Sequence, residues 1–213
     1  MKLGGAHAGI SVGPDGATHQ ALEDISLMRT IPGMTVIVPS DDNETRLAVK
    51  AMLDYKGPVY FRTGRPAVES VTGDIPGYSF QIGKGCQLRD GSDVTLIACG
   101  LMVQRTLKAA DLLAAEGISA RVIDMATIKP IDREIIVKAA KETGAIVTAE
   151  EHNIIGGLGS AVAEVVCQEC PVPMAMVGQQ DTFGESGSPD ELLEKYGMTA
   201  AAIEEKVKYL VNA

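Results

Sequence analysis

The second half of the chain alternates short, continuous apolar runs with segments of helical periodicity. A short apolar run without polar interruption is typical of a strand that is covered on both faces of a sheet. The predicted strands are residues 94–98, 120–125, 145–149 and 174–177, and the predicted helices are residues 103–116, 132–144, a segment from about 160, and 199–210. Because strands and helices alternate, we expect a largely parallel sheet with right-handed crossovers.

Local signals mark several of these helix ends. Gly117 follows the first predicted helix and is a good helix stop. Asp132 can cap the start of the next helix, with Pro130 just ahead of it, and Gly144 ends that helix. A glycine-rich turn at 156–159 leads into the helix from about Ser160.

The first block of the chain follows the same pattern but is short. Residues 34–38 and 58–61 are predicted strands, and residues 18–30 and 42–53 are predicted helices. Two or three apolar strands and two helices cannot cover both faces of a parallel sheet, and an open strand edge invites aggregation. We therefore expect either that another chain completes this layer or that the sequence is a fragment. A turn-rich seam at about 70–92 separates the two blocks.

Composition excludes some functions. The chain has 213 residues, 46% of them hydrophobic, and a formal net charge of −9. Nucleic acids and anionic lipids repel so acidic a chain. No signal peptide and no run of about 20 apolar residues is visible, which predicts a cytoplasmic location without a membrane span.

The four cysteines do not indicate a metal site. Cys99 lies in an apolar run and is interpreted as a core residue. Cys167 and Cys170 form a C-x-x-C pair, but a zinc site needs further ligands, and His152 is the only histidine in the last two thirds of the chain. Packing at a helix end is favoured over a redox or metal site.

The strongest candidate for chemistry is the segment HAGISVGPDGATHQ, residues 7–20, called the ligand loop below. It holds His7, Asp15 and His19 among several glycines, which let a backbone bend sharply and approach a ligand. If Thr18 caps the following helix, the positive end of that helix points at the loop and suits a phosphate or an oxyanion. Residue types and spacing alone fit a ligand loop and an exposed polar turn equally.

Two arginines follow the predicted strand at 58–61. Arg62 and Arg65 lie just past its end, in the sequence FRTGRP, where ligands bind in open α/β sheets. Arginine makes bidentate contacts to phosphate, although a lone arginine at a strand end is more often solvated. The histidines and aspartate expected at the same sheet edge favour a binding role.

Two further polar segments are not assigned a catalytic role. Glu150, Glu151 and His152 end a strand before the glycine-rich turn, which lacks the G-x-G-x-x-G spacing of a dinucleotide site. A carboxylate pair at a domain or subunit contact is the favoured interpretation. The polar loop DTFGESG at 181–187 receives no chemical role.

The chain resembles the transketolase family over nearly its whole length. The stretch HAGISVGPDGATHQALEDISLMRTIPGMTVIVPSDDNET resembles the second half of the pyrimidine-binding domain, and VIDMATIKPID, TAEEHNIIGGLGSAVAEV and DTFGESG resemble the C-terminal domain. The resemblance implies an α/β fold: an incomplete parallel-sheet pyrimidine-binding layer at 1–75, a linker at 76–92, and a three-layer α/β/α C-terminal domain at 93–213.

The resemblance also implies roles for single residues. His7 helps to bind the sugar phosphate, Asp15 holds a substrate hydroxyl, and Arg65 grips the phosphate. His19 lies near the reacting carbons, where it contacts the cofactor and helps to move protons or stabilise charge. Asp15 and His19 are the implied catalytic residues. The implied reaction moves a two-carbon ketol unit from a ketose phosphate to an aldose phosphate with thiamine diphosphate and Mg²⁺.

Comparison with related enzyme families, and the family residues that this sequence lacks, bear on the predicted transketolase activity. Deoxyxylulose-phosphate synthases share D-G-x-T-H-Q but usually lack the histidine at His7, and β subunits of 2-oxoacid dehydrogenases lack T-H-Q. Pro14 departs from the acidic residue common before Asp15. The family's activating glutamate, its ring-stacking aromatics and its diphosphate- and magnesium-binding domain are missing here.

These absences leave two hypotheses. The first is half of a split transketolase, inactive alone, which pairs with an N-terminal diphosphate-binding subunit and dimerises through its C-terminal region. The second is a non-catalytic assembly module or truncated remnant.

Overall fold

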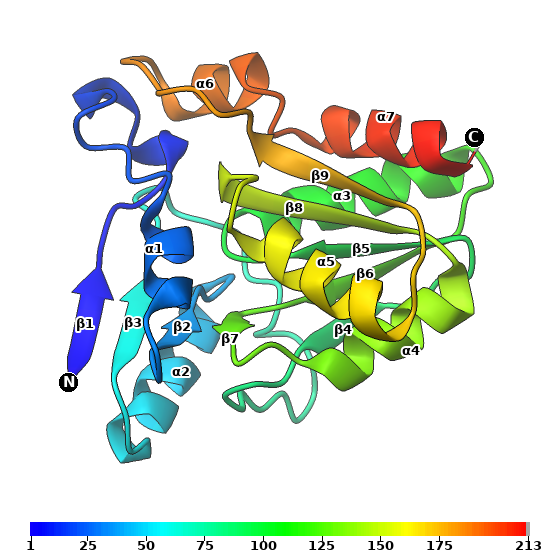
Figure 1. Cartoon of the computed structure of the whole chain (residues 1–213). Coiled ribbons are helices and arrows are strands. Elements are labelled where there is room, and N and C mark those ends of the chain that lie inside the picture. The colour runs from blue at the N-terminus through cyan, green and yellow to red at the C-terminus, as the bar shows by residue number, and fades with distance from the viewer. Residues whose placement is uncertain (212–213) are drawn as a thin grey trace.

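The computed structural model describes residues 1–211, arranged around two sheets (Figure 1). In chain order the elements are β1 (Lys2–Gly5), the 3₁₀ helix η1 (Ile10–Asp15), α1 (Asp24–Thr30), β2 (Thr35–Ile37), α2 (Asp42–Asp54), β3 (Val59–Arg62), β4 (Cys86–Arg89), β5 (Val94–Ala98), α3 (Met102–Ala115), β6 (Ala120–Asp124), β7 (Thr127–Lys129), α4 (Arg133–Thr143), β8 (Ile146–Asn153), α5 (Leu158–Glu169), β9 (Met174–Gln179), α6 (Pro189–Lys195) and α7 (Ala200–Val211).

The second sheet has the predicted three-layer form. Its strand order is β4-β6-β5-β8-β9, and all pairs are parallel except that of β4 with β6. Successive side chains of a strand point to opposite faces. Leu96 accordingly packs in one core with residues of α3 and α7, and Ile97 in another with residues of α4 and α5. In Figure 1, α5 lies in front of this sheet and α3 behind it. The mixed α/β prediction is confirmed.

The predicted helix signals of α4 are confirmed in detail. The carboxylate of Asp132 accepts a hydrogen bond from the backbone N–H of Ile135 at 3.2 Å. Gly144 ends the helix in the left-handed conformation, with φ of 71°, and its N–H donates to the carbonyl of Ala140. These two caps satisfy backbone groups that a helix leaves unpaired at its ends.

The first sheet is shared between the two blocks. Its strand order is β1-β3-β2-β7, with β1 and β2 parallel to β3. The antiparallel strand β7 comes from the second block and pairs with β2. One edge of this layer is therefore covered from within the chain. At the other edge, β1 pairs only with β3 among residues 1–211, and most of β1 is exposed (Figure 1).

The predicted helix from Thr18 to Thr30 is wrong in its first part. Helix α1 begins at Asp24, and Thr18 lies in a turn. The carbonyl of Ala21 accepts hydrogen bonds from the N–H of Gly9 at 3.0 Å and from Arg62 Nη2 at 3.2 Å. A helix would need that carbonyl for its own hydrogen bonds. The loop interactions therefore compete with helix formation before residue 24.

Some observed elements differ from those predicted from the sequence, and others were not predicted. Strand β4 falls within the expected linker at 76–92 and pairs along β6. Helix α6 and strand β7 were not expected. Cys99 is buried as predicted, and all four cysteines are free thiols. Residues 212–213 of the predicted second domain lie outside the described residues. No helix between residues 1 and 211 is both long and apolar enough to cross a membrane.

Candidate functional site

The ligand loop leaves β1 with a series of unusual backbone angles. His7 has φ of 57°, which is uncommon for a residue with a side chain, and Gly9, Gly13 and Gly16 have φ of 96°, 79° and 75°. Between them, Ile10 to Gly13 are buried within or beside the short helix η1. The glycines let the loop turn back on itself while its apolar residues enter the core.

The structure brings Asp15 and Arg65 together. Arg65 Nη1 donates to Asp15 Oδ2 at 3.2 Å and to the carbonyl of Val12 at 2.9 Å. Both side chains remain accessible, with exposed fractions of 43% for Arg65 and 46% for Asp15. The loop after β3 therefore contacts the ligand loop directly, at the edge where both strands end.

The two predicted histidines lie on the same part of the fold but have different surroundings. His19 is exposed; its N–H donates to the carbonyl of Gly16 at 3.0 Å, and its Nδ1 lies 2.9 Å from Thr18 Oγ1. His7 is exposed and, within residues 1–211, its ring makes no hydrogen bond. Backbone hydrogen bonds of Ala8 and Gly5 with Thr63 hold the His7 segment beside the loop that carries Arg65.

The expected helix dipole does not act on this loop. Because α1 begins at Asp24, no helix starts at Thr18. The cation that the structure places at the loop is Arg65, which is paired with Asp15. Two imidazoles, a carboxylate and a guanidinium are a set that suits a polar, anionic ligand.

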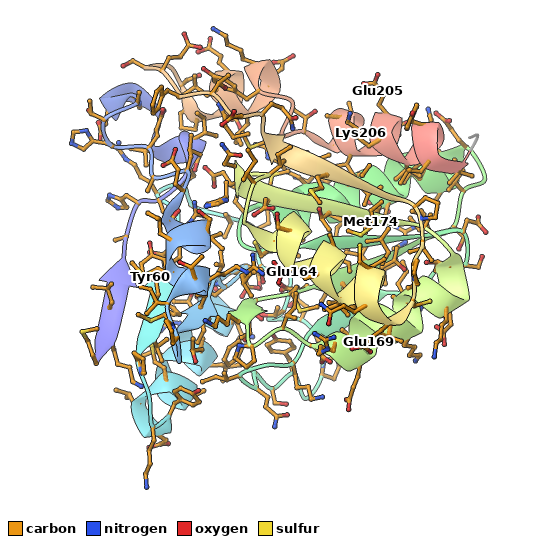
Figure 2. The ribbon with its side chains drawn as sticks, viewed as in Figure 1. Tyr60, Glu164, Glu169, Met174, Glu205 and Lys206 are labelled. Atoms are coloured by element: carbon orange, nitrogen blue, oxygen red, sulfur yellow. The ribbon has the colours of Figure 1, made fainter. Side chains whose placement is uncertain are left out.

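A buried ionic cluster lies behind the loop. Arg62 Nε donates to Asp24 Oδ2 at 2.8 Å, and Tyr60, labelled in Figure 2, donates to the same oxygen at 2.7 Å. Burial raises the pKa of Asp24, but Arg62 and Tyr60 outweigh it and the net shift is downward. Arg62 Nη2 also donates to the carbonyl of Glu151 at 2.9 Å, so this cluster joins the two blocks.

The acidic pair and His152 have structural partners. Glu150 accepts hydrogen bonds from the N–H groups of Leu158 at 2.7 Å and Gly159 at 2.8 Å, at the start of α5. Burial raises the pKa of Glu150 to about 7. Burial and then the charge of Arg62 lower the pKa of His152 to about 4, so its ring is neutral at pH 7. Its Nδ1–H then donates to the carbonyl of Asn153 at 2.6 Å.

Of the carboxylate pair predicted at a domain or subunit contact, Glu151 contacts the other block, whereas Glu150 binds α5 of its own block. Oε1 of Glu151 accepts a hydrogen bond from the backbone N–H of Ser11, in the ligand loop, at 2.6 Å. On the surface, Glu164 of α5 (Figure 2) adds an ion pair at 2.9 Å to Arg29 of α1. Sequence reasoning found the carboxylate pair but not its partners, because these lie far away in the chain.

A cavity of about 380 Å³ lies where β2 and β3 end and the two blocks meet. Arg62 and Glu151 contribute to its wall, together with the starts of α2 and α3. None of His7, Asp15, His19 and Arg65 lines it. Among residues 1–211, no group of three or more His, Cys, Asp or Glu side chains is placed to hold a metal ion.

Comparisons with known proteins agree on one family. The family model of the transketolase C-terminal domain matches residues 83–203, and that of the transketolase pyrimidine binding domain matches residues 1–70. The 6-deoxy-6-sulfo-D-fructose transketolase subunit SqwH of Clostridium sp. (strain MSTE9) is 47% identical over 204 residues, which cover 95% of this chain and 62% of that protein. The 1-deoxy-D-xylulose-5-phosphate synthase of Heliobacterium modesticaldum is 42% identical over 205 residues, which cover 95% of this chain and 31% of that protein.

A solved structure shares the whole fold. It is described as a split gene transketolase, inactive beta4 tetramer; it is 51% identical, has a TM-score of 0.92, and the match covers 99% of this chain and 67% of that one. The chain thus spans less than two thirds of the sulfofructose transketolase subunit and about two thirds of the split-gene chain. The two family models, matched in chain order, and the close structural match show that this chain belongs to the transketolase family and corresponds to the C-terminal part of a transketolase.

Proposed function

We propose that this chain provides the substrate-binding side of a transketolase that moves a two-carbon ketol unit from a ketose phosphate to an aldose phosphate. The observation that carries the proposal is the contact between Asp15 and Arg65 at an exposed rim. A sugar phosphate needs one group for its charged end and others for its hydroxyls, and this rim offers both kinds.

Arg65 is suited to grip the charged end. Both of its hydrogen bonds use Nη1, which leaves Nε and Nη2 without a protein partner in the described chain. Those two nitrogens form the fork that binds two oxygens of one phosphate. Asp15 would orient the guanidinium and accept a hydrogen bond from a substrate hydroxyl.

The exposed histidines complete the proposed site. His7 would help to bind the sugar phosphate. His19 would face the reacting carbons and hold or deliver a proton there, since either ring nitrogen of an imidazole can carry a proton. Fixed polar groups of this kind align a substrate and stabilise developing charge once water is excluded.

The cofactor is proposed to lie between this chain and a partner. Thiamine diphosphate and Mg²⁺ would be held mainly by a diphosphate-binding partner chain, as the family resemblance implies, and His19 of this chain would contact the cofactor. When bound, the cofactor supplies the carbanion chemistry of the reaction. The proposed partners are therefore that subunit and, through the C-terminal region, a second copy of this chain.

The test is reconstitution. The chain would be mixed with a diphosphate-binding transketolase subunit, thiamine diphosphate, Mg²⁺ and a ketose–aldose phosphate pair. We expect ketol transfer by the mixture and none by the chain alone. Turnover by the isolated chain would refute the half-site proposal.

Two alternatives are separated in the same assay. Because one relative is named for a sulfofructose and another for deoxyxylulose phosphate, 6-deoxy-6-sulfofructose is included as a donor and 1-deoxyxylulose 5-phosphate is measured as a product. A non-catalytic assembly module is the other candidate, because the similar solved structure is described as an inactive beta4 tetramer. It predicts stable association with the partner and no turnover of any donor.

A further inference from the structure

The carboxylate of Glu151 reaches from β8 of the second block into the ligand loop. Its Oε1 accepts the N–H of Ser11, a residue 140 positions away in the chain, at 2.6 Å, and the side chain is almost fully buried. The backbone of Gly9 passes so close that a Cβ there would lie 2.3 Å from the same oxygen. The loop and the carboxylate are therefore in direct contact on both sides of Ile10.

The position of Ser11 makes this contact important for the candidate site. Ser11 and Val12 are consecutive residues in the first part of η1, and the carbonyl of Val12 accepts a hydrogen bond from Arg65 at 2.9 Å. Gly13, with φ of 79° and ψ of −112°, kinks η1 between these residues and Asp15, so η1 is not one rigid helix. A shift of Ser11 would therefore move the Val12 carbonyl, and with it the Arg65 guanidinium that contacts Asp15.

The polar loop at 181–187 is a second part of the second block that is hydrogen-bonded to the ligand loop, through Gln20. Gln20 is buried, and its Nε2 lies 3.1 Å from the carbonyl of Ile10, 3.3 Å from that of Gly13 and 2.9 Å from that of Glu185. The segment before α6 accordingly lies beside the ligand loop at the upper left of Figure 1. Gln20 thus ties the start of η1 and its kink at Gly13 to the second block.

Glu151 is itself held in place. Arg62 Nη2 donates to the backbone carbonyl of Glu151 at 2.9 Å, and Arg62 is fixed by its ion pair with Asp24. Such a chain of buried polar contacts limits how far the carboxylate can move. Its neighbour Glu150 points to α5 and has no hydrogen bond to the ligand loop in the described structure.

We propose that Glu151 is a positioning residue, whose carboxylate fixes Ser11 and, through the adjacent carbonyl of Val12, the placement of Arg65 against Asp15. The second block would then have a direct part in substrate binding, in addition to any part in assembly. The effect on substrate rests on the proposed function, whereas the effect on the loop does not.

The first test measures amide hydrogen exchange by NMR in the full chain. A hydrogen bond to a charged group is worth about 1.5–3 kcal/mol, which corresponds to about 10- to 150-fold faster exchange when it is removed. We expect that acceleration at the amide of Ser11 in Glu151→Ala. Glu151→Gln keeps an acceptor but loses the charge, so we expect an intermediate acceleration of about threefold or more.

Glu150→Gln is the matched control, because it replaces a carboxyl group by an amide at the adjacent buried position. It should accelerate exchange at Leu158 and Gly159 and leave Ser11 unchanged. Unchanged exchange at Ser11 in Glu151→Gln, or equal acceleration at Ser11 in Glu150→Gln, overturns the proposal. Glu151→Gln decides the matter if Glu151→Ala does not fold, as judged by circular dichroism.

The second test uses the reconstituted enzyme. Glu151→Ala should raise KM for the ketose phosphate about tenfold or more, and this effect should shrink to less than threefold in an Arg65→Ala background, because Glu151 acts through Arg65. Equal effects in both backgrounds would show a purely structural role. If the wild-type mixture has no activity, the proposed function fails, while the exchange result still decides the role of Glu151.

Discussion

Asp15 and Arg65 are 50 positions apart in the chain, and their side chains meet at 3.2 Å on the exposed rim formed by the ends of β1 and β3. The contact uses a single guanidinium nitrogen, Nη1. A phosphate oxygen pair can therefore bind the remaining fork without displacing Asp15. This geometry gives the first prediction.

Arg65→Ala should lower kcat/KM for phosphorylated substrates in the reconstituted enzyme. The loss should correspond to about 1.5–3 kcal/mol, the scale of hydrogen bonds to a charged group. The measurement is kcat/KM for sugar phosphates and for the same sugars without phosphate. Arg46→Ala, on the exposed face of α2, is the matched control and should have no effect. An equal loss with unphosphorylated sugars would exclude the phosphate role.

A second prediction concerns the buried pair of Arg62 and Asp24. Arg62→Leu removes a cation that is almost fully buried and leaves the carboxylate of Asp24 without its cationic partner, although Tyr60 still donates a hydrogen bond to it. Removing one partner of a buried ion pair costs about 3–5 kcal/mol. We expect that decrease in the free energy of unfolding, measured by urea denaturation.

The control for this prediction is the exposed pair of Arg46 and Asp42, whose side chains are 75% and 74% exposed. Arg46→Leu should change the free energy of unfolding by about 0.5 kcal/mol or less. If the two substitutions cost the same, the Arg62 cluster does not stabilise the contact between the blocks.

The second block could be predicted well because its signals are local. The apolar runs of β5, β6 and β8 stand out without knowledge of their neighbours, and Asp132 and Gly144 cap α4 through residues three or four positions away. Strand β7 was not predicted, because it is short and its partner β2 lies in the other block. Its pairing depends on the packing of the whole chain.

The candidate site was predictable only in part, for a similar reason. The strand-end rule and the family resemblance placed Asp15 and Arg65 at one edge, and they meet there. The predicted helix start at Thr18 was wrong, because the carbonyl of Ala21 accepts hydrogen bonds from Gly9 and Arg62. The reach of Glu151 to Ser11 follows from how the two blocks pack, which no local pattern records.

A third prediction follows from the raised pKa of Glu150. Its usual value is 4.5 and burial raises its pKa to about 7 in the folded chain, so between these values the folded state binds more protons than the unfolded state. The stability that Glu150 contributes is therefore fully present below pH 4.5 and is lost as the pH rises through 7. Across this window the change is about 3 kcal/mol.

The measurement compares the free energy of unfolding of wild type and Glu150→Gln from pH 4.5 to 7.5. The difference between them should shift by about 3 kcal/mol against the wild type as the pH rises, because glutamine does not titrate. Glu205→Gln, on the exposed face of α7 (Figure 2), controls for the loss of one negative charge. A constant difference between wild type and Glu150→Gln would show that Glu150 does not bind its proton more tightly in the folded chain.

The last prediction separates backbone strain from steric contact in the ligand loop. Gly9 and Gly33 both have positive φ, 96° and 75°, so alanine at either position is strained. A Cβ at Gly33 meets nothing within 4 Å, whereas one at Gly9 would lie 2.3 Å from Glu151 Oε1. Gly33→Ala should therefore cost about 1 kcal/mol. Gly9→Ala should cost about 2 kcal/mol more from overpacking, in addition to the strain of a backbone with φ of 96° and ψ of 174°, a region that only glycine adopts readily.

A double-mutant cycle identifies the atom that is responsible. If the carboxylate of Glu151 causes the extra cost, Gly9→Ala should be about 1–2 kcal/mol less destabilising in a Glu151→Ala background, because the side chain that it would meet is gone. Gly33→Ala should cost the same in both backgrounds, since it lies in open space. Additive losses for Gly9→Ala would mean that the loop is kept in place by its own backbone conformation, and that Glu151 follows the loop and does not fix it.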